Sequence, residues 1–229
     1  MSNAKKETTV EPQYDRCLEV RDVYGQSPLG LMSNQTWHDD PKRLGFLLSR
    51  YKFVAKMCQG KGSVLEVGAA DAFGTRIVQQ VVPKVTVVDF DPVFVQDVRS
   101  RMNPEWMFEC FEHDMLKGPV PGAFDAAFAL DVIEHIQPKD EIAFVGNMVQ
   151  SLNRSGIVIL GSPSIHSQAY ASPPSKAGHV NCKDYDGMKA LLHNFFENVF
   201  VFSMNDEVVH TGFSMMANYF IGIGCTRKK

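Results

Sequence analysis

The chain lacks the features that mark secreted, membrane-spanning and nucleic-acid-binding proteins. Its five cysteines are scattered and form no C-x-x-C pair, which argues against a disulfide framework or a zinc site. No apolar run approaches the ~18 residues of a membrane span, and the polar first twelve residues lack the apolar core of a signal peptide. The formal net charge of −3 offers no overall basic surface to a nucleic acid. We therefore expect a cytoplasmic protein that binds neither nucleic acid nor a membrane.

What is present is the composition of one globular domain. Of the 229 residues, 45% are hydrophobic and 21% are charged, which is ordinary for a chain with one buried core. Neither an internal repeat nor a low-complexity linker divides the sequence. We expect an N-terminal segment over residues 1–38, disordered at 1–13 and irregular at 14–38, that could act as a lid. A single domain should then occupy residues 39–229.

Short apolar runs alternate with helical patterns after residue 39. The expected strands are 64–67, 85–88, 107–111, 126–130 and 157–160. The expected helices are 41–58, 74–81, 92–102, 139–152 and 185–194. Because the strands are apolar almost throughout, they should form a parallel sheet that helices cover on both faces.

The C-terminal part follows a different pattern. Two β-rich runs, 199–204 and 214–225, are separated only by residues 205–213, which is too short for a helical crossover. They should therefore form an antiparallel hairpin. The prediction is a doubly wound, mostly parallel, seven-stranded sheet with a C-terminal antiparallel hairpin and helices on both faces. Dinucleotide-binding oxidoreductases usually continue with parallel strands instead.

Acidic residues follow the expected strands at the edge where a doubly wound sheet binds its ligand. The first strand runs into a loop of small residues, 68–72, whose backbone can turn sharply and lie close to a ligand. Asp89, Asp114 and Asp131 follow the next three strands. Carboxylates at successive strand ends suit an adenosine without phosphates, since a pyrophosphate site needs backbone donors and no neighbouring carboxylate.

These residues resemble the motifs of the class I, Rossmann-like S-adenosylmethionine-dependent methyltransferases, in particular the small-molecule branch. Glu66 and Gly68 match the first motif of that family, and the run from Asp131 to His135 is similar to its quinone-biosynthesis and small-molecule members. The resemblance implies S-adenosylmethionine as cofactor, S-adenosylhomocysteine as product, and a set of cofactor-binding residues. That set is Glu66, Gly68, Ala69 and Ala70 near the methionine part, Asp89 and Phe90 at the ribose, Asp114 and Met115 at the adenine, and Leu130 and Asp131 at the sulfonium and its amino-acid tail.

Two alanines depart from the family's first motif. Ala70 and Ala72 stand where the family usually has glycine. Each added methyl group could narrow the approach to the cofactor or force φ away from positive values. They are the best support for an alternative reading, in which the chain is a catalytically degenerate protein that binds the nucleoside and transfers nothing.

Histidines are the natural bases for methyl transfer to a hydroxyl near neutral pH. His135 follows the fourth strand, and His179 lies in the long connection 162–183 after the fifth. We expect one of them to be the catalytic base, and we expect no metal site. The predicted reaction is O-methylation of a small-molecule acceptor such as a sugar, a quinone or phenol precursor or another metabolite. N-methylation of an amino sugar or amine is the alternative reaction, and the protein could be a homodimer.

Overall fold

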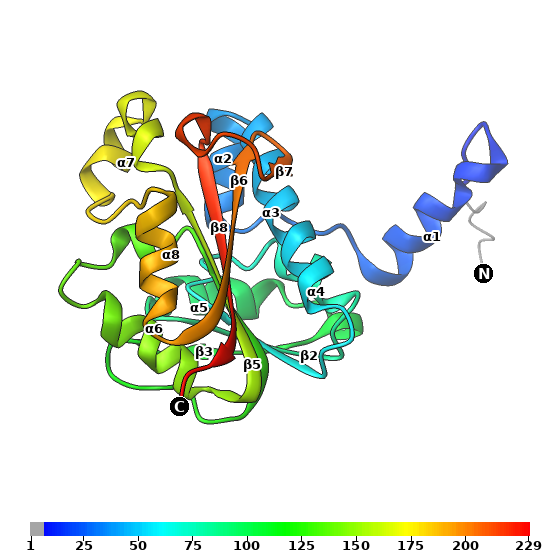
Figure 1. Ribbon diagram of the computed structural model, residues 1–229. Helices are drawn as coiled ribbons and strands as arrows, with labels where there is room; N and C mark the ends of the chain where they lie inside the picture. The colour runs from blue at the N-terminus through cyan, green and yellow to red at the C-terminus, as the bar shows by residue number, and fades with distance from the viewer. Residues whose placement is uncertain (1–6) are drawn as a thin grey trace.

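A twisted sheet of eight strands forms the centre of the computed structural model, which describes residues 7–229 (Figure 1). The strands are β1 Ser63–Val67, β2 Lys84–Asp89, β3 Glu109–Glu112, β4 Phe124–Leu130, β5 Leu152–Pro163, β6 Phe196–Asn205, β7 Val208–His210 and β8 Tyr219–Arg227. Their order across the sheet is β3-β2-β1-β4-β5-β8-β6-β7. The first five strands are parallel, and β8 lies antiparallel between β5 and β6. The mostly parallel sheet with an antiparallel C-terminal part is confirmed.

The strand count differs from the predicted seven because the connection after β6 contains a further strand. Residues 208–210 pair with the end of β6 and form β7 at the edge of the sheet. Residues 214–216, expected to belong to the last strand, form a short 3-10 turn, and β8 begins only at Tyr219. β5 is longer than predicted, since it starts at Leu152 directly after the helix that precedes it.

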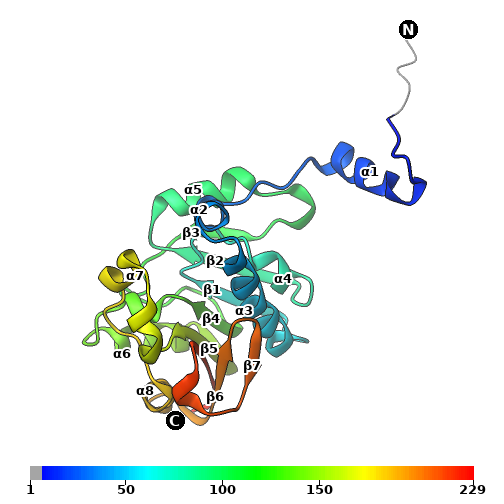
Figure 2. The ribbon, with the colours of Figure 1, turned by 90° about the horizontal axis from the view of Figure 1, so that it is seen from above.

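Helices cover both faces of the sheet, as predicted. They are α1 Asp15–Tyr24, α2 Leu31–Asp39, α3 Lys42–Cys58, α4 Thr75–Gln79, α5 Pro92–Arg101, α6 Glu141–Gln150, α7 Pro173–Gly178 and α8 Tyr185–His193. Figure 2 shows α6 and α8 on one side of the sheet and α3 and α4 on the other. Each side has its own core, because neighbouring strand residues point to opposite faces; Leu65 belongs to one core and Val64 to the other.

The expectation of an irregular segment over residues 14–38 is wrong, because α1 and α2 form there. Neither helix has a strong apolar stripe, so the periodicity of the sequence could not reveal it. Hydrogen bonds to the body of the protein hold the start of α2. The N–H and Oγ of Ser33 donate to the carboxylate of Asp71, in the loop after β1, at 2.5 and 3.2 Å. The N–H of Leu31 donates to Asp97 at 3.3 Å. The predicted disorder of residues 1–13 lies in part outside the described residues.

Within the described residues, no helix is long and apolar enough to cross a membrane. In both views α1 stands apart from the body of the protein (Figures 1 and 2). The division of the chain at residue 38 remains a proposal. The contacts of Ser33 and Leu31 show that at least the start of α2 packs on the domain that follows it.

Candidate functional site

The loop after β1 keeps a backbone conformation that favours glycine. Gly68, Ala70 and Ala72 have φ values of +70°, +46° and +51°. For the two alanines, this left-handed conformation costs roughly 1–2 kcal/mol each. A side chain at Gly68 would lie 2.5 Å from Cγ2 of Val132. The alanines therefore do not force φ to negative values, and the loop retains the shape that glycine would give it.

The carboxylate of Asp89 fixes this loop to the end of β2. Its Oδ2 accepts the N–H of Ala70 at 2.8 Å, and its Oδ1 accepts the N–H of Asp91 at 2.9 Å. Asp89 is buried, yet each carboxylate oxygen can accept a second hydrogen bond. Phe90, next in the chain, is 71% exposed. An exposed ring beside a buried carboxylate is available to a ligand.

Glu66 lies beneath the loop and has both oxygens occupied. Oη of Tyr51 donates to Oε1 and Oγ1 of Thr75 donates to Oε2, each at 2.6 Å. Burial raises the pKa of Glu66 to about 7. The structure thus gives Glu66 a role in holding α3 and α4 against the loop, and its predicted contact with a cofactor stays a prediction.

The residues after β3 face the same edge of the sheet. Asp114 accepts the N–H of Leu116 at 2.9 Å, and its other oxygen lies 3.5 Å from Nζ of Lys117. Met115 is buried, and its carbonyl accepts Nδ2 of Asn147 at 2.7 Å. The strand ends of β2 and β3 therefore carry Asp89 and Asp114 on one edge, as the sequence predicted.

Asp131, after β4, pairs with an arginine that the sequence did not reveal. Nη1 of Arg50 lies 2.6 Å from Oδ2 of Asp131, and Cζ of Arg50 lies 3.8 Å from the ring centroid of Tyr219. The φ of Asp131 is +57°. Leu130, before it, is buried. Because Arg50 comes from α3 and Tyr219 from β8, only the folded chain brings them to Asp131.

Buried polar atoms without hydrogen-bond partners gather around Asp131. Among the described residues there are four such side-chain atoms, and three of them are Nε of Arg50, Oε2 of Glu134 and Oη of Tyr219. Burial, and then the charge of Asp131, raises the pKa of Glu134 and of Tyr219 well above their usual values. Since nearly all buried polar groups in proteins are paired, these atoms are places where a ligand or an ordered water molecule can bind.

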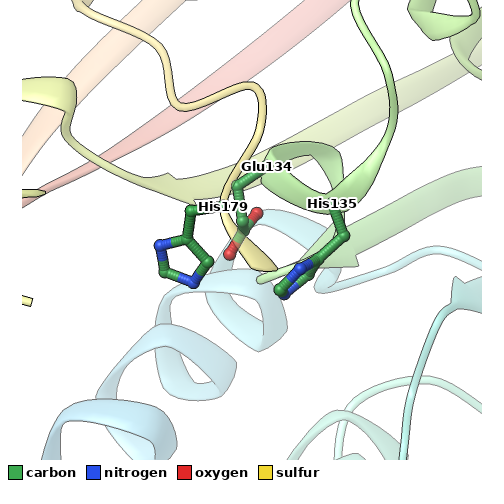
Figure 3. A group of neighbouring side chains, drawn as sticks. All are labelled: Glu134, His135 and His179. Carbon is green, nitrogen blue, oxygen red and sulfur yellow. The ribbon is translucent and has the colours of Figure 1, made fainter. Parts of the chain in front are cut away.

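Backbone hydrogen bonds bring the two predicted histidines together. His135 ends a short 3-10 turn, Ile133–His135, and the carbonyl of Glu134 accepts the N–H groups of Val180 and Asn181 at 2.8 and 3.0 Å. His179 therefore lies beside His135, with ring centroids 5.1 Å apart and the rings at 73°. Figure 3 shows the carboxylate of Glu134 between them.

The two imidazole rings have different exposure and one common feature. His135 is exposed and His179 is half-buried, and burial followed by the charge of His135 lowers the pKa of His179. Nδ1 of each ring has a partner: the carbonyl of Gly178 at 3.0 Å for His135, and Oε1 of Gln168 at 2.8 Å for His179. We expected no metal-ligand set, but Glu134, His135 and His179 offer ligand atoms that all lie within 4.8 Å of one another.

A cavity of about 600 Å³ opens beside His179. Arg50 and Tyr219 line it together with residues of α3, of the connection after β5 and of the end of β6. Its other polar lining residues include Asp40, Arg43, Ser167, Gln168, Asp206 and Asn218. The aromatic rings of Phe46 and Tyr170 also face it.

Residues 65–160 match a family described as a methyltransferase domain. A probable S-adenosylmethionine-dependent methyltransferase of Mycobacterium tuberculosis is 30% identical over 115 residues, which are 50% of this chain and 40% of that protein. A similar protein of Mycolicibacterium smegmatis is 27% identical over 115 residues, 50% of this chain and 42% of its own. The chain thus spans less than half the length of these curated relatives.

Solved methyltransferases share the fold. The N-methyltransferase NodS from Bradyrhizobium japonicum, in complex with S-adenosylhomocysteine, is 17% identical with a TM-score of 0.59, over 82% of this chain and 89% of NodS. A TehB-like methyltransferase from Corynebacterium glutamicum is 14% identical with a TM-score of 0.62, over 85% of this chain and 96% of its own. Residues 65–160 of this chain are therefore similar to a methyltransferase domain, and the chain has the fold of solved S-adenosylmethionine-dependent methyltransferases. The curated relatives are described as S-adenosylmethionine-dependent, and NodS was solved with S-adenosylhomocysteine.

The edge of the sheet fits this cofactor. The methyltransferase domain holds Asp89 and Asp114 at successive strand ends, with the loop at residues 68–72 in a glycine-like conformation beside them. The same edge carries Asp131 and the unpaired atoms around it. One edge of the sheet therefore carries the carboxylates, and the polar cavity opens next to it, where Arg50 and Tyr219 line its wall.

Proposed function

We propose that the protein transfers the methyl group of S-adenosylmethionine to a hydroxyl group of a polar small-molecule acceptor. The observation that carries this proposal is the histidine pair: His179 lines the 600 Å³ cavity, and the ring of His135 lies 5.1 Å from the ring of His179. Methyl transfer needs an acceptor aligned with the sulfonium and, for a hydroxyl, a group that takes its proton. The histidine pair offers that group.

The cofactor lies, in this proposal, along the strand ends in the order that the family resemblance implies. Gly68, Ala69 and Ala70 contact its methionine part, Asp89 and Phe90 its ribose, Asp114 and Met115 its adenine, and Leu130 and Asp131 its sulfonium side. A carboxylate suits the ribose because it can accept hydrogen bonds from both hydroxyls. The exposed ring of Phe90 can pack on the sugar or base.

The reaction is a displacement at the methyl carbon. The acceptor oxygen forms a bond to that carbon while the carbon–sulfur bond breaks, and its electron pair stays on sulfur to give S-adenosylhomocysteine. The hydroxyl proton passes to Nε2 of His135 or His179. Nδ1 of each ring is held by a carbonyl group, so Nε2 of the neutral ring is the atom free to accept the proton.

The cavity favours a polyhydroxylated acceptor, such as a sugar. Its wall carries hydrogen-bonding side chains from several directions, among them Arg43, Asp206 and Asn218. A flat apolar substrate would leave such groups unpaired, which costs about 1–3 kcal/mol for each buried one. The acceptor remains a small molecule in this proposal, and we keep the predictions of no nucleic-acid partner, of a homodimer and of a cytoplasmic location.

Calorimetric titration with S-adenosylmethionine and S-adenosylhomocysteine tests the cofactor part, with NADH as a negative control. Asp89→Ala should abolish the binding, whereas Asp91→Ala, which removes only a helix cap, should retain it. Mass spectrometry of mixtures of sugars and amino sugars then identifies a methylated product. Products methylated only at nitrogen would show that the reaction is N-methylation and not O-methylation. Tight cofactor binding without any transfer would overturn the proposal in favour of a binding protein.

A further inference from the structure

We propose that Glu134, His135 and His179 bind a divalent transition-metal ion. The ligand atoms of these three side chains all lie within 4.8 Å of one another, and Figure 3 shows them converging from the turn after β4 and from the connection after β5. Two imidazoles and one carboxylate form a common ligand set for zinc, and for iron and related ions that keep open positions. The site goes beyond the proposed function, since an ion could bind here without any transfer reaction.

The protonation of both rings suits metal binding. The Gly178 carbonyl can only accept a hydrogen bond, so Nδ1 of His135 carries the proton and Nε2 keeps its lone pair. Nε2 of Gln168 donates to the carbonyl of Ser164 at 3.2 Å, which turns Oε1 of Gln168 toward His179. Nδ1 of His179 is therefore also the donor. Metal-binding histidines generally donate their second ring nitrogen in this way, which orients the ring.

The carboxylate of Glu134 supplies the second, independent observation. Only 1% of Glu134 is exposed, and its Oε2 has no hydrogen-bond partner among the described residues. An unpaired buried carboxylate oxygen is costly. A cation between the two rings would pair with that oxygen and remove the cost.

The distances allow an ion with small movements of the side chains. Bonds of about 2.0–2.2 Å to a metal place neighbouring ligand atoms ~3.3 Å apart in a tetrahedral site. The present separations of up to 4.8 Å must therefore shorten by roughly 1–1.5 Å. His135 is exposed and His179 is half-buried, so both rings can make that movement while Glu134 stays fixed.

Three protein ligands leave at least one position of the ion open, as in catalytic zinc sites. Because His179 also lines the cavity, the open position is accessible from the acceptor side. A role of the ion in methyl transfer rests on the proposed function. An acceptor hydroxyl bound to the ion would lose its proton to solvent more easily. The histidine lone pairs would then serve as ligands, and the ion would replace the histidine base.

Metal binding can be measured on the full chain without cofactor. Chelator-treated protein is titrated with Zn²⁺ and with Mn²⁺ in a calorimeter, and the absorption of a Co²⁺ complex reports the ligand set. One ion should bind per chain. Glu134→Gln and His179→Gln should each weaken binding by about tenfold or more, and Gln168→Leu, which removes the partner of His179, by about 10–100-fold. His166→Gln, in the same connection, is the matched control.

Binding of S-adenosylhomocysteine by every variant shows that the fold and the cofactor site are intact. Failure of both Zn²⁺ and Mn²⁺ to bind the unmodified chain would overturn the inference. Equal binding by the parent chain, Glu134→Gln and His179→Gln would also overturn it. Since these measurements require no methyl transfer, their failure leaves the proposed function standing, and loss of cofactor binding alone leaves the metal site standing.

Discussion

Replacing Ala70 by glycine should stabilise the protein. The φ of Ala70 is +46°, a conformation that costs an L-residue roughly 1–2 kcal/mol and glycine almost nothing. Glycine also makes the unfolded chain more flexible, which offsets about 0.4–1 kcal/mol of this gain. Ala70 is only half-buried, so its methyl group contributes little packing. The net expectation is a gain of about 0.5–1 kcal/mol in the free energy of unfolding.

The neighbouring alanine provides an internal comparison. Ala72 has a similar φ of +51° but is buried, and removal of a buried methyl group costs about 0.8 kcal/mol. In Ala72→Gly the lost packing should therefore cancel the relieved strain, and the free energy of unfolding should stay close to that of the parent chain. Ala190→Gly, on the exposed side of α8, should destabilise by about 1 kcal/mol, because glycine is a poor helix former.

Urea unfolding of the three variants measures these differences directly. For a chain of this size, the expected gain in Ala70→Gly corresponds to a rise in Tm of about 1–4 °C. Titration with S-adenosylhomocysteine should give an affinity close to that of the parent chain, since the loop keeps its shape. If Ala70→Gly is destabilised as strongly as Ala190→Gly, the assignment of strain to this loop is refuted.

Three further predictions concern the charged groups and the histidine pair. Burial raises the pKa of Glu66 from 4.5 to about 7, so protonated Glu66 stabilises the fold below pH 4.5 and this contribution is lost as the pH rises to about 7. The free energy of unfolding, measured in urea, should therefore fall by on the order of 3 kcal/mol across that range because of Glu66. In Glu66→Gln this part of the pH dependence should be absent. Arg50→Met leaves Asp131 without its cation. A double-mutant cycle with Asp131→Asn, measured as free energies of unfolding in urea, should give a coupling energy of about 1–3 kcal/mol. Additive effects of the two substitutions would contradict the pairing. In Gly178→Ala the new methyl group would lie 3.3 Å from Cε1 of His135 and displace the ring, so transfer activity should fall while S-adenosylhomocysteine binding, measured by calorimetry, stays unchanged.

The parallel sheet could be predicted because its signals are local. Each central strand is a short run of apolar residues, and the helix that follows it has an apolar stripe, so the period of the pattern distinguishes them. The carboxylates at the strand ends could be predicted for the same reason, since a strand end is visible in the sequence. The short strand Val208–His210 could not, because it depends on pairing with the end of β6.

The proposed acceptor side of the site depends on contacts between distant residues. Arg50 and Asp131 are 81 positions apart, and in the sequence Arg50 is one of several cations on a helix. His135 and His179 were each identified as a candidate base, but nothing in the sequence placed them next to each other. The hydrogen bonds from Val180 and Asn181 to the carbonyl of Glu134 do so, and such backbone ties leave no mark on side-chain composition.

The position of β8 between β5 and β6 has a consequence for the order of assembly. β6 and β7 are synthesised before β8, yet they join the sheet only through β8. During synthesis, which proceeds from the N-terminus, the hairpin of β6 and β7 must wait while the edge of β5 stays unpaired. An open edge of this kind is prone to pair with other chains. β8 also carries Tyr219, the ring under Arg50, so this contact forms only after the sheet has closed. Nascent chains that stall before residue 219 would therefore be prone to aggregate.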